Sequence, residues 1–167
     1  VYTDDAELVQ EVYQRYDEDS RLNKSQAARV EFLTTVQYIE KYLTPGAKIL
    51  DIGAGAGEYS LHFARKGYQV SALELADANI AAFRAKMTKD DPIDLIQGNA
   101  LDLSLYDCNS FDIVLLFGPL YHLHKEEDRL RCIEEAKRVC KKGGKIFFAF
   151  ISNDIVILTM QQTHSDY

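Results

Sequence analysis

The fold is decided by the stretch KILDIGAGAGEYS, residues 48–60. An apolar, β-branched run ends in the carboxylate of Asp51, and glycines follow at alternate positions, Gly53, Gly55 and Gly57. The residues after them suit a helix. Glycine tolerates sharp bends and lets a ligand approach the backbone closely. This order therefore predicts a strand, a tight turn and a helix N-terminus, the place where α/β sheets bind extended nucleotide-like ligands.

The glycine spacing narrows the class of ligand. Dinucleotide enzymes carry Gly-x-Gly-x-x-Gly, whereas here the third glycine falls at position 57 and Glu58 follows it. A glutamate would repel a pyrophosphate at the helix end that should attract an anion. An NAD-type dehydrogenase is thus disfavoured, and the lack of Gly-Lys-Ser/Thr excludes a P-loop. A turn edged by Asp51 and Glu58 suits a cationic ligand better.

Three further segments follow the glycine turn. Residues 68–75 (YQVSALEL) predict a second strand, separated from the turn by a helix over 58–66 that Gly67 closes. An acid about 20 residues beyond such a turn is placed to accept hydrogen bonds from ribose hydroxyls, and Glu74 fits. Residues 93–103 predict a short strand that runs into a polar turn. Residues 110–117, apolar without alternation, predict a buried parallel strand, which Gly118-Pro119 ends.

The order Asp-x-Gly-x-Gly-x-Gly, followed by an acid after the second strand, resembles the class I S-adenosylmethionine (SAM)-dependent methyltransferases over residues 48–151. The resemblance implies SAM as cofactor and S-adenosylhomocysteine (SAH) as product. It implies that Glu74 holds both ribose hydroxyls, that the Asn99 side chain meets the adenine amino group, and that the Ala100 N–H meets a ring nitrogen. Asp102 competes with Asn99 for that role. A carbonyl near Phe117 would receive the ammonium of the methionine moiety. The implied cofactor-binding residues are Asp51, Gly53, Ala54, Gly55, Gly57, Glu74, Leu75, Asn99, Ala100, Leu101 and Phe117.

The remaining pattern completes an α/β sheet. Apolar residues at helical spacing predict a helix over 126–142, which Gly143-Gly144 stops before a fifth strand over 145–151. The series reads β-α-β-α-β-(α)-β-α-β and predicts a doubly wound, mostly parallel sheet with helices on both faces. The family sheet closes with further strands, so we expect the domain at 48–167 to be C-terminally incomplete here. Residues 154–162 are expected to begin the next helix or to form an apolar segment.

Residues 1–47 precede this series and carry two helical stripes, over 4–17 and 26–43, which Thr44-Pro45-Gly46 ends. Two helices in this place are common among small-molecule methyltransferases, so the resemblance implies an N-terminal helical cap segment that acts as a lid over the SAM pocket. The alternative is that the two helices only pack against the domain. This alternative applies to each of the residues that could otherwise reach a ligand. Those residues are Tyr13, Tyr16, Arg21, Arg29 and Glu31.

The candidate catalytic residues follow the fourth strand. Methyl transfer is an in-line displacement, so the protein must mainly position the acceptor, and in the family the residues after Phe117 face the methyl group. His122 is the candidate base because histidine titrates at about 6.5, although a packing role is the alternative. Tyr121 offers an orienting hydroxyl or an aromatic wall for a cationic centre. His122 and His124 form His-x-His, but no acid cluster supports a metal, and none is expected.

Bulk properties limit the partners. A chain of 167 residues that is 47% hydrophobic can form one globular core. The net charge of −7 argues against a nucleic-acid partner. No apolar run is long enough for a membrane span, and we expect no signal peptide. Cys108, Cys132 and Cys140 lack paired spacing, which favours free thiols in a reducing cytoplasm.

These observations predict a SAM-dependent methyltransferase that acts on a small-molecule acceptor. Two alternatives stay open, a non-catalytic SAM-binding sensor or scaffold module and a protein or RNA methyltransferase. The sequence 117–122, FGPLYH, is neither the Asn/Asp-Pro-Pro-Tyr of nucleobase and glutamine amino methylation nor the Pro-Cys of cytosine C5 methylation. It therefore narrows the acceptor by exclusion only, and the oligomeric state is not indicated.

Overall fold

A computed structural model describes residues 4–15 and 25–150. Five parallel strands form one sheet in the order β3-β2-β1-β4-β5. The chain therefore starts in the centre of the sheet, builds outward to β3, and returns to the other side of β1 with β4. This is the predicted doubly wound parallel sheet. In chain order the elements are α1 (Asp4–Arg15), α2 (Gln26–Glu40), β1 (Lys48–Ile52), α3 (Glu58–Arg65), β2 (Gln69–Glu74), α4 (Asp77–Lys86), β3 (Ile93–Gln97), β4 (Phe111–Leu116), α5 (Pro119–His122), α6 (Glu126–Val139) and β5 (Cys140–Phe148).

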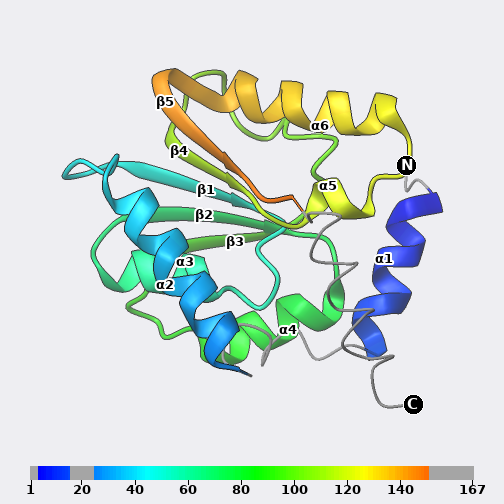
Figure 1. The fold of residues 1–167 in the computed structure, drawn as a ribbon, viewed down its shortest axis with the longest axis horizontal. Helices are drawn as coiled ribbons and strands as arrows, with labels where there is room; N and C mark the ends of the chain where they lie inside the picture. The colour runs from blue at the N-terminus through cyan, green and yellow to red at the C-terminus, as the bar shows by residue number, and fades with distance from the viewer. Residues whose placement is uncertain (1–3, 16–24, 151–167) are drawn as a thin grey trace, which may run out of the picture.

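Helices cover both faces of the sheet, with α6 on one face and α2 and α3 on the other (Figure 1). The central strands alternate between the two cores. Ile49 of β1 packs in the core that α2 and α3 share, whereas Leu50 packs in the core beneath α6. Since both faces are buried, the strands read as continuous apolar runs, as the sequence of β4 does.

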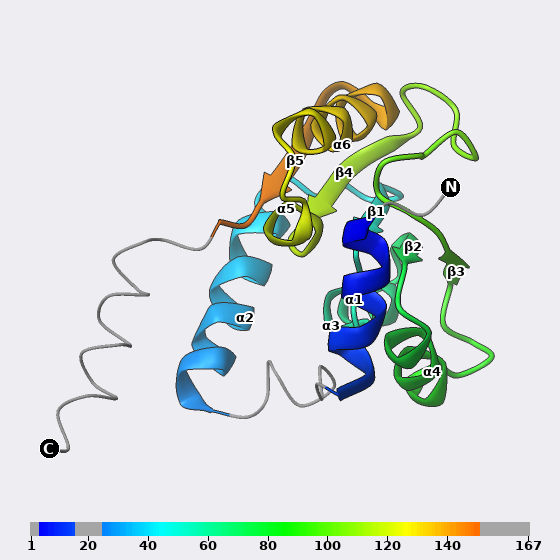
Figure 2. The same cartoon turned by 90° about the vertical axis from the view of Figure 1, so that its right-hand side faces the viewer.

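The carboxyl ends of the strands face α1 and α2. Seen onto this edge, the two helices stand apart on either side, with α5 between and above them (Figure 2). Ligands bind α/β sheets at this edge, where the strand order reverses, and here the reversal lies between β1 and β4. The expected helix over 26–43 ends at Glu40. The predicted residues 16, 17 and 154–162 lie outside the described residues.

The prediction for residues 140–151 was wrong in one respect. Helix α6 ends at Val139, and Gly143-Gly144 lie inside β5 instead of stopping the helix. The strand register shifts between Phe111 and Ile113 at this point, which marks a bulge. Gly143 has a φ of +82°. A Cβ on Gly144 would lie 2.8 Å from the Asp112 carbonyl oxygen. The glycines therefore let a bent strand approach its neighbour.

Two short segments also differ from the prediction. The optional helix between the third and fourth strands is absent, because residues 98–110 form turns. A short helix, α5, follows Gly118, where no element was predicted. Pro119 occupies its first turn, where the fixed φ of proline suits a helix and its missing N–H costs no hydrogen bond. Helix α5 aims the predicted catalytic residues at the sheet edge.

Candidate functional site

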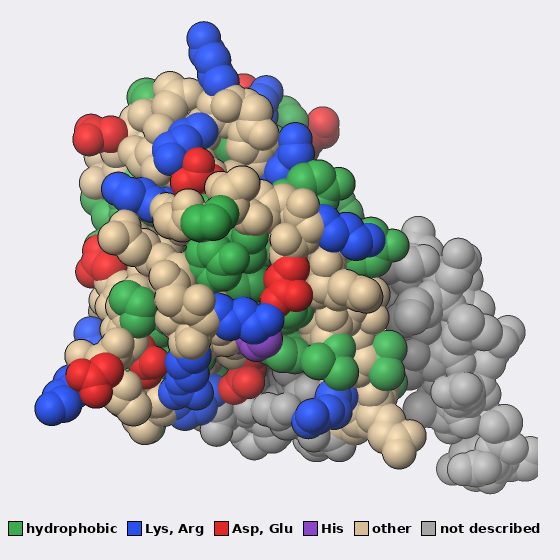
Figure 3. Space-filling view, turned by 90° about the vertical axis from the view of Figure 1, so that its left-hand side faces the viewer, with side chains coloured by type: hydrophobic (Ala, Val, Ile, Leu, Met, Phe, Trp, Pro, Cys, Tyr) green, Lys and Arg blue, Asp and Glu red, His purple; other side chains and the backbone are tan. Residues whose placement is uncertain are grey.

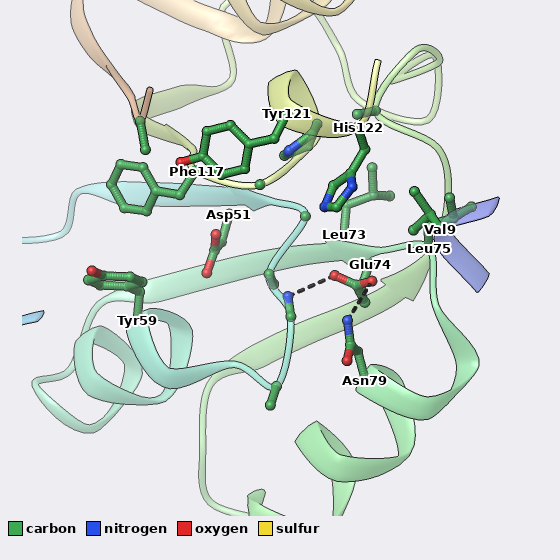
Figure 4. A pocket seen from close by; sticks show the side chains of 18 of the residues that line it. Val9, Asp51, Tyr59, Leu73, Glu74, Leu75, Asn79, Phe117, Tyr121 and His122 are labelled. Atoms are coloured by element: carbon green, nitrogen blue, oxygen red, sulfur yellow. Dashed lines mark hydrogen bonds between the residues drawn. The ribbon is translucent and has the colours of Figure 1, made fainter. Parts of the chain in front are cut away.

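A cavity of about 1070 Å³ opens at the carboxyl edge of the sheet, between the glycine turn, α5, α1 and α2. Figure 4 shows side chains from α1, α3, α4, α5 and the ends of the strands around it. All but one of the residues predicted to bind cofactor or to act in catalysis line this cavity. They are Asp51, Gly53, Ala54, Gly55, Gly57, Glu74, Leu75, Asn99, Ala100, Phe117, Tyr121 and His122.

The exception is Leu101. Its side chain is buried in the core beneath α6 and does not line the cavity. The cause is the turn that precedes it, in which the Leu101 N–H donates to Oδ1 of Asn99 at 2.9 Å. This local bond uses the side-chain oxygen of Asn99, so its Nδ2 remains as a donor. Asp102, the competing residue, is exposed and lines a different hollow with Arg131 and Arg138.

The glycine turn is held against two neighbours. Gly53 has a φ of +71°, and a Cβ there would lie 2.6 Å from Cδ of Pro119. Gly57 has a φ of +85°, and a Cβ there would overlap the buried Phe83 ring. Side chains rarely adopt such φ values. These glycines are therefore required by the packing of the turn itself as well as by access to the cavity.

Glu74 joins the glycine turn to α4. Its Oε2 accepts from the Gly55 N–H at 2.7 Å, and its Oε1 accepts from the Ala76 N–H at 2.9 Å and from Nδ2 of Asn79 at 3.3 Å. Figure 4 draws the bonds from Gly55 and from Asn79 as dashed lines. Burial raises the pKa of Glu74, and the hydrogen bonds from Ala76 and Gly55 oppose that rise. A carboxylate offers about four acceptor positions, so capacity remains for a further donor.

Asp51 is the second buried carboxylate of the cavity, with 2% of its surface exposed. Its Oδ2 accepts from the Ser60 hydroxyl at 2.7 Å. Burial raises the pKa of Asp51 to about 6, the Ser60 bond acts against this rise, and the charge of Glu74 adds to it. The side chain points into the cavity among Tyr59, Phe117 and Tyr121 (Figure 4).

His122 faces the cavity from α5. Its Nε2 lies 3.1 Å from the hydroxyl of Tyr13 on α1. Burial lowers the pKa of His122, and the charge of His124 acts in the same direction while that of Asp5 opposes it. The imidazole is consequently neutral near pH 7 and able to accept a proton. Tyr121, the other predicted catalytic residue, lines the cavity and is partly exposed.

The two imidazoles of His-x-His do not converge. Nδ1 of His124 lies 2.7 Å from Oδ1 of Asp5, whereas His122 meets Tyr13. Within residues 4–15 and 25–150, no group of His, Cys, Asp or Glu side chains is arranged to hold a metal ion. The geometry thus assigns the two histidines to separate contacts with α1.

Helix α1 bridges both sides of the cavity. Gln10 donates from Nε2 to the Leu75 carbonyl oxygen at 2.8 Å and accepts at Oε1 from the Asp77 N–H at 3.1 Å. Asp5 accepts from the His124 N–H at 3.1 Å. The helix is thereby fixed to the β2–α4 connection at one side and to the segment after α5 at the other.

The N-terminal candidates divide into three groups. Tyr13 and Glu31 line the cavity. Arg29 is exposed and does not line it. Tyr16 and Arg21 lie outside the described residues. The sequence analysis did not identify Gln10, Ser60 or Asn79 as residues of the site. Ser60 and Asn79 could have been found, because they are polar residues on the inward faces of short helices.

The lining has a clear charge pattern. It contains the carboxylates of Asp5, Glu31, Asp51, Glu58 and Glu74. Among the described lining residues there is no lysine or arginine. A phosphate or pyrophosphate is normally bound by arginine, lysine or free backbone donors, and one such donor, the Gly55 N–H, is already bonded to Glu74. The donor set fits a ligand with a cationic centre better than a dinucleotide.

Comparison with known proteins agrees with this geometry. A model of the "Methyltransferase domain" family matches residues 50–148. A putative methyltransferase of Encephalitozoon cuniculi is 33% identical over 135 residues, 81% of this chain and 59% of the relative. The demethylmenaquinone methyltransferase of Clavibacter sepedonicus is 32% identical over 114 residues, 68% of this chain and 44% of the relative.

A solved structure with the same fold is the glycopeptide N-methyltransferase MtfA complexed with SAH. It superposes with a TM-score of 0.59 and 26% identity, over 69% of this chain and 47% of that protein. The chain spans about half the length of the curated relatives that it matches. The family model covers more than half of the chain. The chain therefore belongs to the class I SAM-dependent methyltransferase family.

Proposed function

We propose that this chain binds SAM and transfers its methyl group to a small-molecule acceptor. The observation that carries the proposal is the pair of buried carboxylates, Asp51 and Glu74, beside a glycine turn. They line a cavity without lysine or arginine among its described residues. SAM carries a sulfonium and an ammonium but no phosphate, so its charges suit this lining. The cavity volume of about 1070 Å³ lies just above the usual range for ligand sites, about 300–1,000 Å³.

Each part of SAM has a proposed partner. Glu74 receives the ribose hydroxyls, and the turn at Asn99 and Ala100 receives the adenine. Asp51 and the carbonyl near Phe117 attract the ammonium of the methionine moiety. The glycine turn and Leu75 complete the wall. Leu101 is left out of this set, because its side chain lies in the core.

The chain's own residues position the acceptor and move one proton. SAM supplies the activated methyl group when it is bound. His122 accepts the proton of an acceptor that arrives protonated, and Tyr121 orients that acceptor. Residues 4–15 and 25–47 serve as a lid: Gln10 and Asp5 bond α1 to both sides of the cavity, and Glu31 and Tyr38 of α2 line it. Alignment of this kind is worth about 7–11 kcal/mol of a barrier.

The test of this proposal is the Glu74→Ala variant. We expect its affinity for SAH to fall by about tenfold or more, because charge-assisted hydrogen bonds contribute about 1.5–3 kcal/mol each. Calorimetric titration of wild type and variant measures the change. An unaltered affinity would contradict the assignment of Glu74 to the ribose hydroxyls.

Glu74 also holds the glycine turn, so a control must separate binding from folding. Glu74→Gln keeps the volume and one of the two acceptor oxygens, but it removes the charge and puts an amide donor in place of the other oxygen. Urea unfolding of both variants gives the loss of stability independently. The proposal requires that Glu74→Gln weaken SAH binding while its free energy of unfolding stays closer to wild type than that of Glu74→Ala.

The affinity for SAH should also depend on pH. A folded pKa of about 6 means that Asp51 loses its charge as the pH falls through that value. The ammonium of SAH then loses its partner, so the dissociation constant should rise by up to about tenfold per pH unit below the pKa. Titrations between neutral and acidic pH test this. Asp51→Asn should flatten the profile, and Ser60→Ala should move its midpoint upward; a wild-type profile that matches Asp51→Asn would contradict the assignment.

A small acceptor is proposed over a nucleic acid. On the face seen in Figure 3, basic and acidic side chains are interspersed and no continuous basic patch forms. A relative's name, demethylmenaquinone methyltransferase, also denotes a small-molecule acceptor. No helix in the described part of the chain is long and apolar enough to cross a bilayer. Cys108, Cys132 and Cys140 are free thiols, which supports the proposed reducing, cytoplasmic setting.

A further inference from the structure

The connection between β2 and α4 is bound by a side chain from α1. Nε2 of Gln10 donates to the Leu75 carbonyl oxygen at 2.8 Å, and its Oε1 accepts from the Asp77 N–H at 3.1 Å. Ala76, the N-cap residue of α4, makes no side-chain capping bond. The first N–H groups of a helix have no partner within the helix. Gln10 therefore supplies, from another helix, an acceptor that the sequence of α4 lacks at this end.

One of these bonds is linked to Glu74 by a single peptide unit. The Leu75 carbonyl and the Ala76 N–H belong to the same peptide unit, which is planar, so a bond that fixes one also orients the other. The Ala76 N–H donates to Oε1 of Glu74 at 2.9 Å. Oε2 of Glu74 accepts from the Gly55 N–H, as Figure 4 shows. A chain of hydrogen bonds thus runs from α1 to the glycine turn, and linked bonds of this kind polarise one another.

Glu74 depends on these donors because it is buried, with only 4% of its surface exposed. Burial raises its pKa, and the hydrogen bond from the Ala76 N–H is the strongest influence that lowers it. If the peptide unit turned away, Oε1 would keep only the longer bond from Nδ2 of Asn79, at 3.3 Å. A buried acceptor that loses its donor is costly. The orientation of this peptide unit therefore decides how Glu74 is held.

A second glutamine holds the same carbonyl. Nε2 of Gln97, at the end of β3, donates to the Leu75 carbonyl oxygen at 3.2 Å and to Oδ1 of Asp77 at 2.6 Å. The bond from Gln10 to this oxygen is the shorter one, and Gln10 also binds the Asp77 N–H. Neither glutamine lines the cavity. Any effect of Gln10 on a ligand must therefore pass through other residues, and a protein without it keeps one donor at Leu75.

We infer that Gln10 is a positioning residue, which orients the peptide unit between Leu75 and Ala76 so that the Glu74 carboxylate is held for the ribose; the inference rests on the proposed function. The docking of α1 and the binding of cofactor at Glu74 then favour each other, because a coupling free energy between two sites acts equally in both directions. Helix α1 in this way helps to build the cofactor site through the backbone.

The test replaces Gln10 by methionine, which has a similar length but no amide. We expect the affinity for SAH, measured by calorimetric titration, to fall by about five- to tenfold, since two hydrogen bonds are lost and Gln97 keeps its own. Gln14→Met is the matched control, the same change at an exposed position of α1. It should leave the affinity unchanged.

Two further measurements distinguish this role from a general effect of α1. In the Glu74→Ala protein, Gln10→Met should lower the affinity for SAH by less than about twofold, because the residue through which it acts is gone. Hydrogen exchange of residues 4–15 measures the reverse direction of the coupling. SAH should slow this exchange in wild type and much less in Gln10→Met.

The outcomes separate this inference from the proposed function. Failure of wild type to bind SAH would contradict the proposed function, and the positioning role would fall with it. If SAH binds, equal affinities of Gln10→Met and Gln14→Met would overturn the inference alone. An equal loss with and without Glu74 would show that Gln10 does not act through Glu74. Exchange of residues 4–15 that does not respond to SAH would contradict the coupling.

Discussion

Replacement of His122 by alanine should lower turnover by about 10²–10⁴-fold, the usual contribution of a positioned base, and should leave SAH affinity nearly intact. The reason is position: His122 faces the cavity from α5 and its Nε2 is 3.1 Å from the Tyr13 hydroxyl. Its neutral state at pH 7 follows from burial, which lowers its pKa. Turnover and SAH titration on the same preparations measure the two quantities separately.

A second variant distinguishes a role of His122 as a base from a role in packing. His122→Gln keeps a hydrogen-bonding group for Tyr13 but cannot take a proton near neutral pH. The wild-type rate should rise with pH through a value below about 6.5, and His122→Gln should lose that limb. His62→Ala is the matched control, because His62 does not line the cavity. Equal losses of turnover and SAH affinity in His122→Ala would indicate a packing role.

Gly57→Ala should destabilise the fold more than any other glycine-to-alanine change in the turn. Gly57 has a φ of +85°, and the added methyl would overlap the fully buried ring of Phe83. The left-handed backbone costs about 1–2 kcal/mol and overpacking about 1–3 kcal/mol. We expect the free energy of unfolding to fall by about 2–5 kcal/mol, measured by urea denaturation.

Gly46→Ala and Gly67→Ala supply the control for Gly57. Both glycines have positive φ values, +78° and +90°, but a Cβ at either would meet nothing within 4 Å. They should lose only the backbone cost of about 1–2 kcal/mol. If all three variants lose the same stability, the contact with Phe83 carries no energy and the packing account of the turn is wrong.

The central sheet could be predicted because its signals are local. The apolar runs, the glycine turn at 53–57 and the cap at Gly67 each act within a few residues. The Gly67 N–H donates to Ala64 and the Tyr68 N–H to Phe63, as expected at a helix end. The position of Glu74 followed from its distance to the turn. The Gly143-Gly144 pair led to a wrong end for the preceding helix. Two glycines can either end a helix or permit a bulge in a strand, and the pairing with the neighbouring strand decides which of these forms.

The contacts of the site with α1 could not be predicted from the sequence, because they join segments that are distant in the chain. Gln10 bonds to Leu75, and Tyr13 meets His122. No periodicity in α1 shows which polar residue turns inward or what it meets. Leu101 lies away from the cavity for a local reason: its N–H donates to Oδ1 of Asn99, and the Leu101 side chain packs in the core beneath α6.

The most direct measurement of the central claim is a calorimetric titration of this chain with SAH, with NAD titrated in parallel. The buried carboxylates Asp51 and Glu74 and a lining without lysine or arginine among the described residues predict micromolar binding of SAH and no binding of NAD. Preferential binding of NAD, or no binding of SAH, would contradict the account.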